Sequence, residues 1–276
     1  MMDIGLFVLA TEYAMPIDEL ARAAEERGFE SLWIPEHSHI PLDSAYPGDV
    51  PIPKDYAHTY DPFISLTIAA SVTSTIRLGT GICLVIERDT ILTAKEVSTL
   101  DRISGGRFEF GIGAGWNRKE MENHGTVYDT RFDRLRDQIM AMRTIWTEEE
   151  AEYHGEFVDF DPMWAWPKPA QDPYPPILLG GESIHTLRRI VDYCDGWLPR
   201  ARNPEKLLEG METLRRLADD AGRGELPVSV FATPPKWITR FADAGVKRNI
   251  LIVPAEGSDA TLKRLDTYAE FLQGSA

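Results

Sequence analysis

Short runs of apolar and β-branched residues alternate with longer amphipathic stretches along the whole chain. The short runs predict strands at residues 4–8, 31–35, 76–85, 107–113, 176–179, 196–199, 227–232 and 249–253. The longer stretches carry apolar residues at intervals of three and four, and they predict helices at residues 17–27, 61–73, 93–103, 131–146, 185–193, 204–221, 235–244 and 259–271. Helix end signals support this division, because proline follows Asp61 and Asn203 at two starts and Gly28 follows the first helix.

This order of elements predicts an α/β protein with repeated βα units on a parallel sheet. Eight such units in 276 residues favour a single (β/α)8 TIM barrel over residues 1–276. A doubly wound sheet is the alternative, but it usually has fewer units. Two insertions exceed the usual connection length, at residues 36–60 after the second strand and 147–175 before the fifth, and they suggest a lid. In a barrel the active site lies at the carboxyl ends of the strands.

Composition and charge narrow the function. Lys and Arg total 29 against 44 for Asp and Glu, and a net charge of −15 argues against a nucleic-acid partner. The two cysteines, Cys83 and Cys194, exclude a disulfide framework and fit a reducing compartment, so we expect a cytoplasmic protein. No run approaches the roughly 20 apolar residues of a membrane helix, which argues against a membrane partner.

The densest chemical cluster follows the second strand, where Glu36, His37 and His39 reach the predicted barrel mouth. A histidine there can exchange a proton or bind a cofactor ring, with Glu36 orienting or charging it, although it can also simply cap the strand. The pair His37 and His39 also allows a metal-dependent hydrolase. That alternative lacks further ligands, because none of the other four histidines ends the fifth or sixth strand.

Glycines mark three other strand ends. Residues 111–115 read G-x-G-x-G, which brings bare backbone close to a ligand or makes room inside the barrel. Gly180 and Gly181 precede Ser183 at a helix start, which is either an anion site for a cofactor phosphate or a tight turn with an N-cap. In the third strand, Gly79 and Gly81 predict a bulge or space for a flat ring.

Six segments together resemble the bacterial luciferase-like monooxygenase superfamily. They are WIPEH at 33–37, IRLGT at 76–80, KEVSTLDRISGGR at 95–107, GIGAGW at 111–116, LLGG at 178–181 and DGWLP at 195–199. The resemblance spans nearly the whole chain and is strongest to the branch that depends on the deazaflavin coenzyme F420.

The resemblance implies an oxidoreductase that transfers hydride between coenzyme F420, or alternatively FMN, and a small organic substrate, commonly as a homodimer. An FMN-dependent monooxygenase and a cofactor-binding protein without catalysis stay open as alternatives. By position, His37 resembles the histidine beside the reactive ring, and Glu36 the adjacent acidic residue that contacts the cofactor. The other cofactor-binding positions implied are Gly81, Ile82, Cys83, Ala114, Gly115, Gly180, Gly181, Ser183 and Ile184. The first three form a third-strand bulge that often carries a non-prolyl cis peptide.

The tryptophans are assigned separately. Sugar-phosphate dehydrogenases of this family carry a glutamate where this chain has Trp116, so that reaction is not expected. We expect Trp116 to wall an apolar substrate pocket, together with Trp164 and Trp166. Trp33 and Trp197 are predicted to pack between barrel and helices. The negative cofactor tail would need a basic rim, for which the candidates are Arg118, Lys119, Arg188 and Arg189. Cys83 is expected to behave as a small buried apolar residue rather than a nucleophile.

Overall fold

The computed structural model describes residues 3–46, 50–200 and 202–273. Its eight parallel strands follow the order β8-β7-β4-β3-β2-β1-β10-β9. Their bounds are β1 Asp3–Val8, β2 Ser31–Ile34, β3 Arg77–Thr80, β4 Phe108–Ile112, β7 Ile177–Gly180, β8 Gly196–Leu198, β9 Ser229–Phe231 and β10 Arg248–Val253. Parallel bridges from Trp197 to Val228 and from Arg200 to Phe231 join the two ends of this order. The sheet therefore closes into the predicted TIM barrel.

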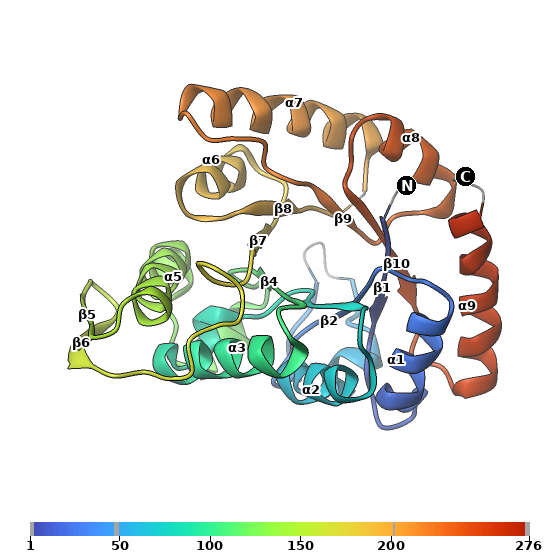
Figure 1. Cartoon of the computed structure of the whole chain (residues 1–276), viewed down its shortest axis with the longest axis horizontal. Helices are drawn as coiled ribbons and strands as arrows, with labels where there is room; N and C mark the ends of the chain where they lie inside the picture. The colour runs from blue at the N-terminus through green and yellow to red at the C-terminus, as the bar shows by residue number, and fades with distance from the viewer. Residues whose placement is uncertain (1–2, 47–49, 201, 274–276) are drawn as a thin grey trace.

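Helices surround the barrel in chain order, with α1 to α3 below it, α6 and α7 above, and α8 and α9 at the right in Figure 1. Their bounds are α1 Ile17–Glu26, α2 Pro62–Val72, α3 Thr90–Ser104, α5 Arg131–Thr147, α6 Ile184–Tyr193, α7 Pro204–Asp220, α8 Ile238–Asp243 and α9 Ser258–Gln273. These agree with the prediction within a few residues. The short helix α4, Arg118–Asn123, was not predicted, because six residues are too few to show a helical period.

Local signals act as expected at the ends of the helices. The Asp61 carboxylate caps α2 by accepting a hydrogen bond from Ile64 N at 3.0 Å, and Pro62 occupies the first helical turn. Gly105 ends α3 in the left-handed conformation, with φ at 70°. These two ends fix where the chain enters and leaves the helices on either side of β3.

Trp33 fills the interior of the barrel. Its side chain is fully buried among Phe7, Leu178, Leu198 and Ile250. A Cβ on Gly79 would lie 2.3 Å from the indole, so this glycine leaves the space that the ring occupies. The structural role predicted for Trp33 is confirmed, but its expected place between barrel and helices is wrong. The space for a flat ring that was expected at Gly79 is therefore occupied by the indole of Trp33.

Trp197, by contrast, lies between the barrel and α7 as predicted. It is 2% exposed, and a Cβ on Gly210 of α7 would lie 2.6 Å from its ring. Its Nε1 donates to the carbonyl oxygen of Gly181 at 2.7 Å. Trp197 thereby holds the loop that follows β7.

A buried charged cluster closes the amino-terminal end of the barrel. The Arg248 side chain is fully buried and donates to the carboxylates of Glu30 and Glu109. Burial opposes ionisation of Glu109, but the guanidinium groups of Arg248 and Arg77 lower its pKa well below the usual range. Because the arginine and glutamate charges are paired with one another, we interpret this cluster as structural.

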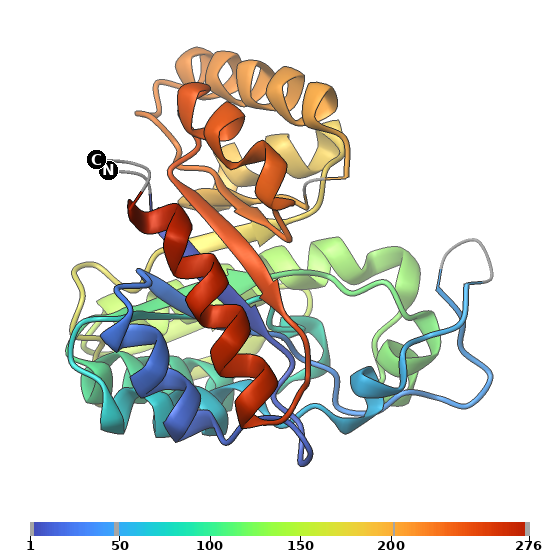
Figure 2. The same ribbon diagram turned by 90° about the vertical axis from the view of Figure 1, so that its right-hand side faces the viewer.

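The two insertions differ in position. The described parts of the first insertion, residues 36–46 and 50–60, reach out from the barrel in Figure 2 and include the 3-10 helix η1 Lys54–His58. They contribute Tyr46 and Tyr56 to its mouth. The second insertion forms an antiparallel hairpin, β5 Ala151–His154 with β6 Asp159–Met163, beside α5. It contributes no residue to the cavity at the mouth, so the lid expected from it is wrong.

Within the described ranges, no helix combines the length and the apolar character needed to cross a membrane.

Candidate functional site

A cavity of about 450 Å³ opens at the carboxyl ends of the strands. It is bounded by residues at or just after the ends of β2, β3, β4, β7 and β8 and by the first insertion. Its walls are mainly apolar and aromatic, with a few polar groups. This is the composition and the position expected of a small-molecule site in a TIM barrel.

His37 lies at this cavity, three residues after β2, with its side chain 6% exposed. Its Nδ1 is 2.8 Å from Oε2 of Glu120 and 3.1 Å from Oε1. The rings of Tyr56 and Trp116 contact the imidazole edgewise, at centroid distances of 5.1 and 5.7 Å. No described residue bonds to Nε2. With the proton on Nδ1 donated to Glu120, Nε2 is the nitrogen left for a bound molecule.

Glu120 is the residue that sequence reasoning missed. It lies on α4, its side chain is fully buried, and Oε1 also accepts from Ser38 N at 3.2 Å. The sequence signal at this point is Asn117 followed three residues later by Glu120, which is typical of a helix start. That pattern predicts a cap and says nothing of the histidine that the carboxylate reaches.

Glu36 has partners other than His37. Its carboxylate accepts from Leu84 N at 2.6 Å and from Arg88 Nε at 2.6 Å. It therefore ties the end of β2 to the segment after β3. The expectation that Glu36 orients or charges His37 is wrong, because Glu120 holds that position. Glu36 does line the cavity edge, and its contact with a cofactor stays a prediction.

A bulge follows Gly79, because three residues separate Gly79 from Cys83 whereas two separate their partners Glu109 and Ile112. The peptide bond between Gly81 and Ile82 is cis, as the resemblance implied. A Cβ on Gly113 would lie 2.0 Å from Cδ1 of Ile82, so this glycine after β4 makes room for the Ile82 side chain. Gly81, Ile82, Ala114 and Gly115 all line the cavity. These four positions are thus brought together as expected.

Cys83 lies behind the cavity wall. Its side chain is fully buried, and burial raises the pKa of the thiol well above its usual range, with a further contribution from Glu36. Cys83 is therefore the small apolar residue that was predicted, and it does not line the cavity.

The turn after β7 also borders the cavity, through Gly180 and Gly181. Gly181 has φ at 114°, and a Cβ there would lie 2.9 Å from Thr186 Oγ1, so both conformation and space require glycine. Ser183 caps α6 by accepting from Thr186 N at 3.1 Å. Ser183 and Ile184 are exposed and do not line the cavity, so their phosphate contact stays a prediction.

The cations at the cavity differ from those expected. Arg200 and Arg202, after β8, line it. None of the four predicted rim residues does. These four residues are Arg118, Lys119, Arg188 and Arg189. Lys119 pairs with Asp43 instead. Because α4 and α6 carry these four side chains outside the cavity, their contact with a cofactor tail stays a prediction.

Trp116 lines the cavity and stacks on Tyr46 at a centroid distance of 4.4 Å. Trp164 and Trp166 are 76% and 55% exposed and belong to the second insertion, so their expected place in the pocket is wrong. The sequence could not distinguish the tryptophan that lines the cavity from the two that are exposed, because it does not show where the segments that carry them lie in the fold.

Metal binding finds no support in the geometry. The ring nitrogens of His39 bond to Ser38 Oγ and to Asn123, whereas Nδ1 of His37 bonds to Glu120. Over residues 3–46, 50–200 and 202–273, no three His, Cys, Asp or Glu side chains are grouped to hold an ion.

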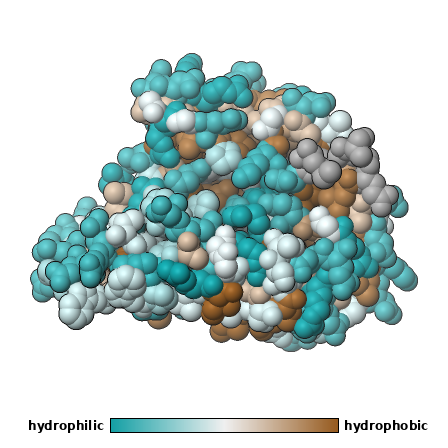
Figure 3. Space-filling model, viewed as in Figure 1, coloured by the Kyte–Doolittle hydropathy of each residue, from teal (hydrophilic) through white to brown (hydrophobic). Residues whose placement is uncertain are grey.

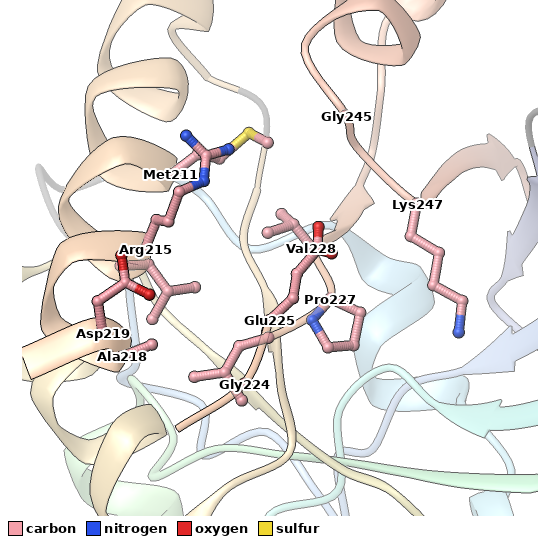
Figure 4. Close-up of a pocket in the computed structure, with 12 residues that line it drawn as sticks. Met211, Arg215, Ala218, Asp219, Gly224, Glu225, Pro227, Val228, Gly245 and Lys247 are labelled. Carbon is pink, nitrogen blue, oxygen red and sulfur yellow. The ribbon is translucent and has the colours of Figure 1, made fainter. Parts of the chain in front are cut away.

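A second pocket, of about 580 Å³, lies at the opposite end of the barrel (Figure 4). It is bounded by α7, by Pro227 and Val228 before β9, and by Lys247 before β10. Active sites of this fold lie at the other end of the strands, so we assign the function to the cavity around His37.

Comparisons with known proteins show which proteins this chain is similar to. An uncharacterized protein of Mycobacterium tuberculosis is 39% identical over 267 residues, which is 94% of each chain. An F420-dependent hydroxymycolic acid dehydrogenase of the same organism is 28% identical over 68% of this chain and 50% of that protein.

Solved structures confirm the fold. The monooxygenase RslO1 from Streptomyces bottropensis has a TM-score of 0.79 at 19% identity and covers 100% of both chains. An F420-dependent secondary alcohol dehydrogenase has a TM-score of 0.78 at 20% identity, with 98% of this chain and 97% of that chain covered. The FMN-bound oxygenating constituent of 3,6-diketocamphane monooxygenase from Pseudomonas putida has a TM-score of 0.68 at 20% identity, covering 83% and 66%. The description of luciferase-like monooxygenases matches residues 2–240, and the chain therefore belongs to the luciferase-like monooxygenase family, which includes F420- and FMN-dependent oxidoreductases.

Proposed function

We propose that this protein is an oxidoreductase that transfers hydride between coenzyme F420 and a small organic substrate. The observation that carries the proposal is the His37 ring, held by Glu120 through Nδ1 at the cavity with Nε2 left unpartnered by the described residues. A histidine in this setting can accept or give one proton, and hydride transfer to or from a carbonyl requires one.

The residues present fit a flavin-type cofactor. The cavity wall includes Gly81 and Ile82, which follow β3, and Ala114 and Gly115, which follow β4. Gly180 and Gly181 lead to the amino-terminal end of α6, where free N–H groups favour a phosphate. Coenzyme F420, when bound, supplies the hydride chemistry.

The chain's own side chains would then do three things. His37 holds or receives a proton at Nε2, and Glu120 keeps its ring in one orientation. Trp116, stacked on Tyr46, covers the cavity and excludes water from the reacting atoms. Arg200 and Arg202 offer positive charge to an anionic group at the rim.

We favour coenzyme F420 over FMN because the Glu36-His37 pair resembles the F420-dependent branch and because a relative at 28% identity carries that cofactor in its name. The test is fluorescence titration of the purified protein with each cofactor, at low and moderate salt. We expect tighter binding of F420 that weakens with salt, since its tail is negative. Preferential binding of FMN, or F420 binding without salt dependence, would contradict the proposal and favour an FMN-dependent monooxygenase.

The same titration with Gly115→Val separates the site from nonspecific binding. Gly115 has φ at 64° and lines the cavity, so valine should weaken binding of the cofactor. Gly125→Val is the matched control, because Gly125 has a similar φ of 78° but has no neighbouring atom within 4 Å and lies outside the cavity.

We also propose that the protein forms a homodimer through α2 and α3. These helices lie side by side, and brown residues gather over them along the lower edge of Figure 3. Ile64 on α2 and Ile91 and Leu92 on α3 are 66%, 41% and 57% exposed, which favours a second copy of the chain as partner. Light scattering should give twice the monomer mass, and Ile64→Glu should halve it. A monomeric wild type would refute this proposal.

A further inference from the structure

Glu87 is a buried acid without a partner near the His37 site. It ends the 3-10 helix η2, Val85–Glu87, and its side chain is 3% exposed. Neither carboxyl oxygen has a hydrogen-bond partner among the described residues. The imidazole of His124 lies nearby, with Nε2 3.9 Å from Glu87 Oε2, but this nitrogen bonds to Ser38 Oγ at 2.7 Å. A charged carboxylate in this position would be desolvated and unpaired, so Glu87 is held as a neutral acid.

A separate chamber of about 340 Å³ adjoins Glu87. It shares Glu36 and His37 with the main cavity, and its other walls are Ser38, Thr59, Asp61, Pro62, Glu87, Arg88 and His124. Such a space is polar and large enough for several water molecules. Glu87 therefore borders a space that can hold water outside the main cavity.

Three acids lie around His37, and only two have partners. Glu36 is bonded to Leu84 N and Arg88, and Glu120 to His37 and Ser38 N. Both of these carboxylates are near enough to repel a negative charge on Glu87.

The surroundings of Glu87 keep its proton in place. Burial, and then repulsion from Glu120 and Glu36, raises the pKa of Glu87 to about 9, although Arg88 acts in the opposite direction. The other titratable groups on the chamber wall are His37, Asp61 and His124. Glu87 therefore keeps its proton at neutral pH.

We propose that Glu87 is a positioning residue that acts on His37 through Glu120. While Glu87 is neutral, the negative charge in contact with the His37 ring is that of Glu120, with no second charge added at Glu87. The Glu120 charge holds the Nδ1 proton of His37 and leaves Nε2 for the cavity. When Glu87 ionises, a second negative charge appears next to Glu120, and the electrostatic surroundings of His37 change without any contact between Glu87 and the substrate. The inference rests on the proposed function only in giving His37 its proton-exchanging role.

The test is an NMR titration of the full-length protein without cofactor, from pH 6 to 10.5. Carbon-13 labelling of the histidine rings follows His37, whose signal is identified by its loss in His37→Asn. We expect a step in the His37 ring resonances centred at about pH 9, caused by Glu87. Glu87→Gln should remove the step, since glutamine is neutral at every pH. Glu122→Gln, on the exposed face of α4, is the matched control and should retain it.

A second measurement does not depend on a variant that folds. The side-chain carboxyl carbon of Glu87 in the wild-type protein should titrate with a midpoint near pH 9. A midpoint below pH 6, a His37 step that persists in Glu87→Gln, or its absence from the wild type would each overturn the proposal. None of these readouts needs a bound cofactor, so they fail independently of the cofactor titration that tests the proposed function.

Discussion

Replacing Glu87 with glutamine should make the protein more stable at neutral and alkaline pH. A group whose pKa is higher in the folded than in the unfolded state stabilises the fold below its unfolded pKa and loses that contribution as the pH rises toward its folded pKa. For Glu87 these limits are 4.5 in the unfolded chain and about 9 in the folded one. The wild-type protein therefore loses stability across this window, and Glu87→Gln does not.

The size of the effect follows from the two pKa values. Each pH unit inside the window costs about 1.4 kcal/mol, because the unfolded chain releases a proton that the folded chain keeps. At pH 7 the penalty is about 3 kcal/mol, and between pH 5 and 8 it grows by about 4 kcal/mol. The new amide can offset part of the gain if it lacks partners, by about 1–3 kcal/mol, but this cost does not vary with pH.

The assay is urea unfolding of the wild type, Glu87→Gln and Glu122→Gln at pH 5, 6, 7 and 8. The difference in the free energy of unfolding between wild type and Glu87→Gln should widen steadily with pH, while Glu122→Gln should follow the wild type. Parallel curves for wild type and Glu87→Gln would refute the reasoning, because they would mean that Glu87 ionises in the folded protein as it does in the unfolded chain.

Three further outcomes are expected. His37→Ala should lower turnover about 10²- to 10⁴-fold while cofactor affinity changes little, which steady-state kinetics and titration measure together; equal turnover would exclude the proton role. Gly181→Val should weaken cofactor binding at least tenfold in a fluorescence titration, because valine is strained at a φ of 114° and meets Thr186, and unchanged affinity would place the phosphate elsewhere. Trp33→Ala should lower the free energy of unfolding by about 3–5 kcal/mol in urea, since it empties the barrel interior, and a loss below 1 kcal/mol would contradict its buried role.

The sequence allowed the barrel and the approximate place of the site to be predicted, because both depend on periodicity and on chain order. Apolar runs mark each strand, and the carboxyl ends of parallel strands must meet at one end of a barrel. His37, Gly81, Ala114 and Gly181 each follow a strand end, so their convergence on one cavity could be predicted residue by residue. The resemblance added the cis peptide after Gly81, which the structure confirms.

Partners across the fold were decided only by the tertiary structure. Glu36 is adjacent to His37 in sequence, yet Glu120, 83 residues away from His37, makes the contact. Adjacent residues at a strand end point in different directions, so sequence proximity does not predict which carboxylate meets an imidazole. The fold also decided which cations lie at the cavity. The four basic residues that were predicted are on α4 and α6, outside the cavity, whereas Arg200 and Arg202 after β8 line it.

Burial gave Glu87 its unusual character. In the sequence it is one acid among 44, and nothing in the residues around it sets it apart. Its raised pKa comes from the loss of water and from two carboxylates contributed by other elements of the barrel. Periodicity and strand order are local properties that the sequence determines by itself, whereas desolvation and the pairing of charges depend on which segments the closed barrel brings together.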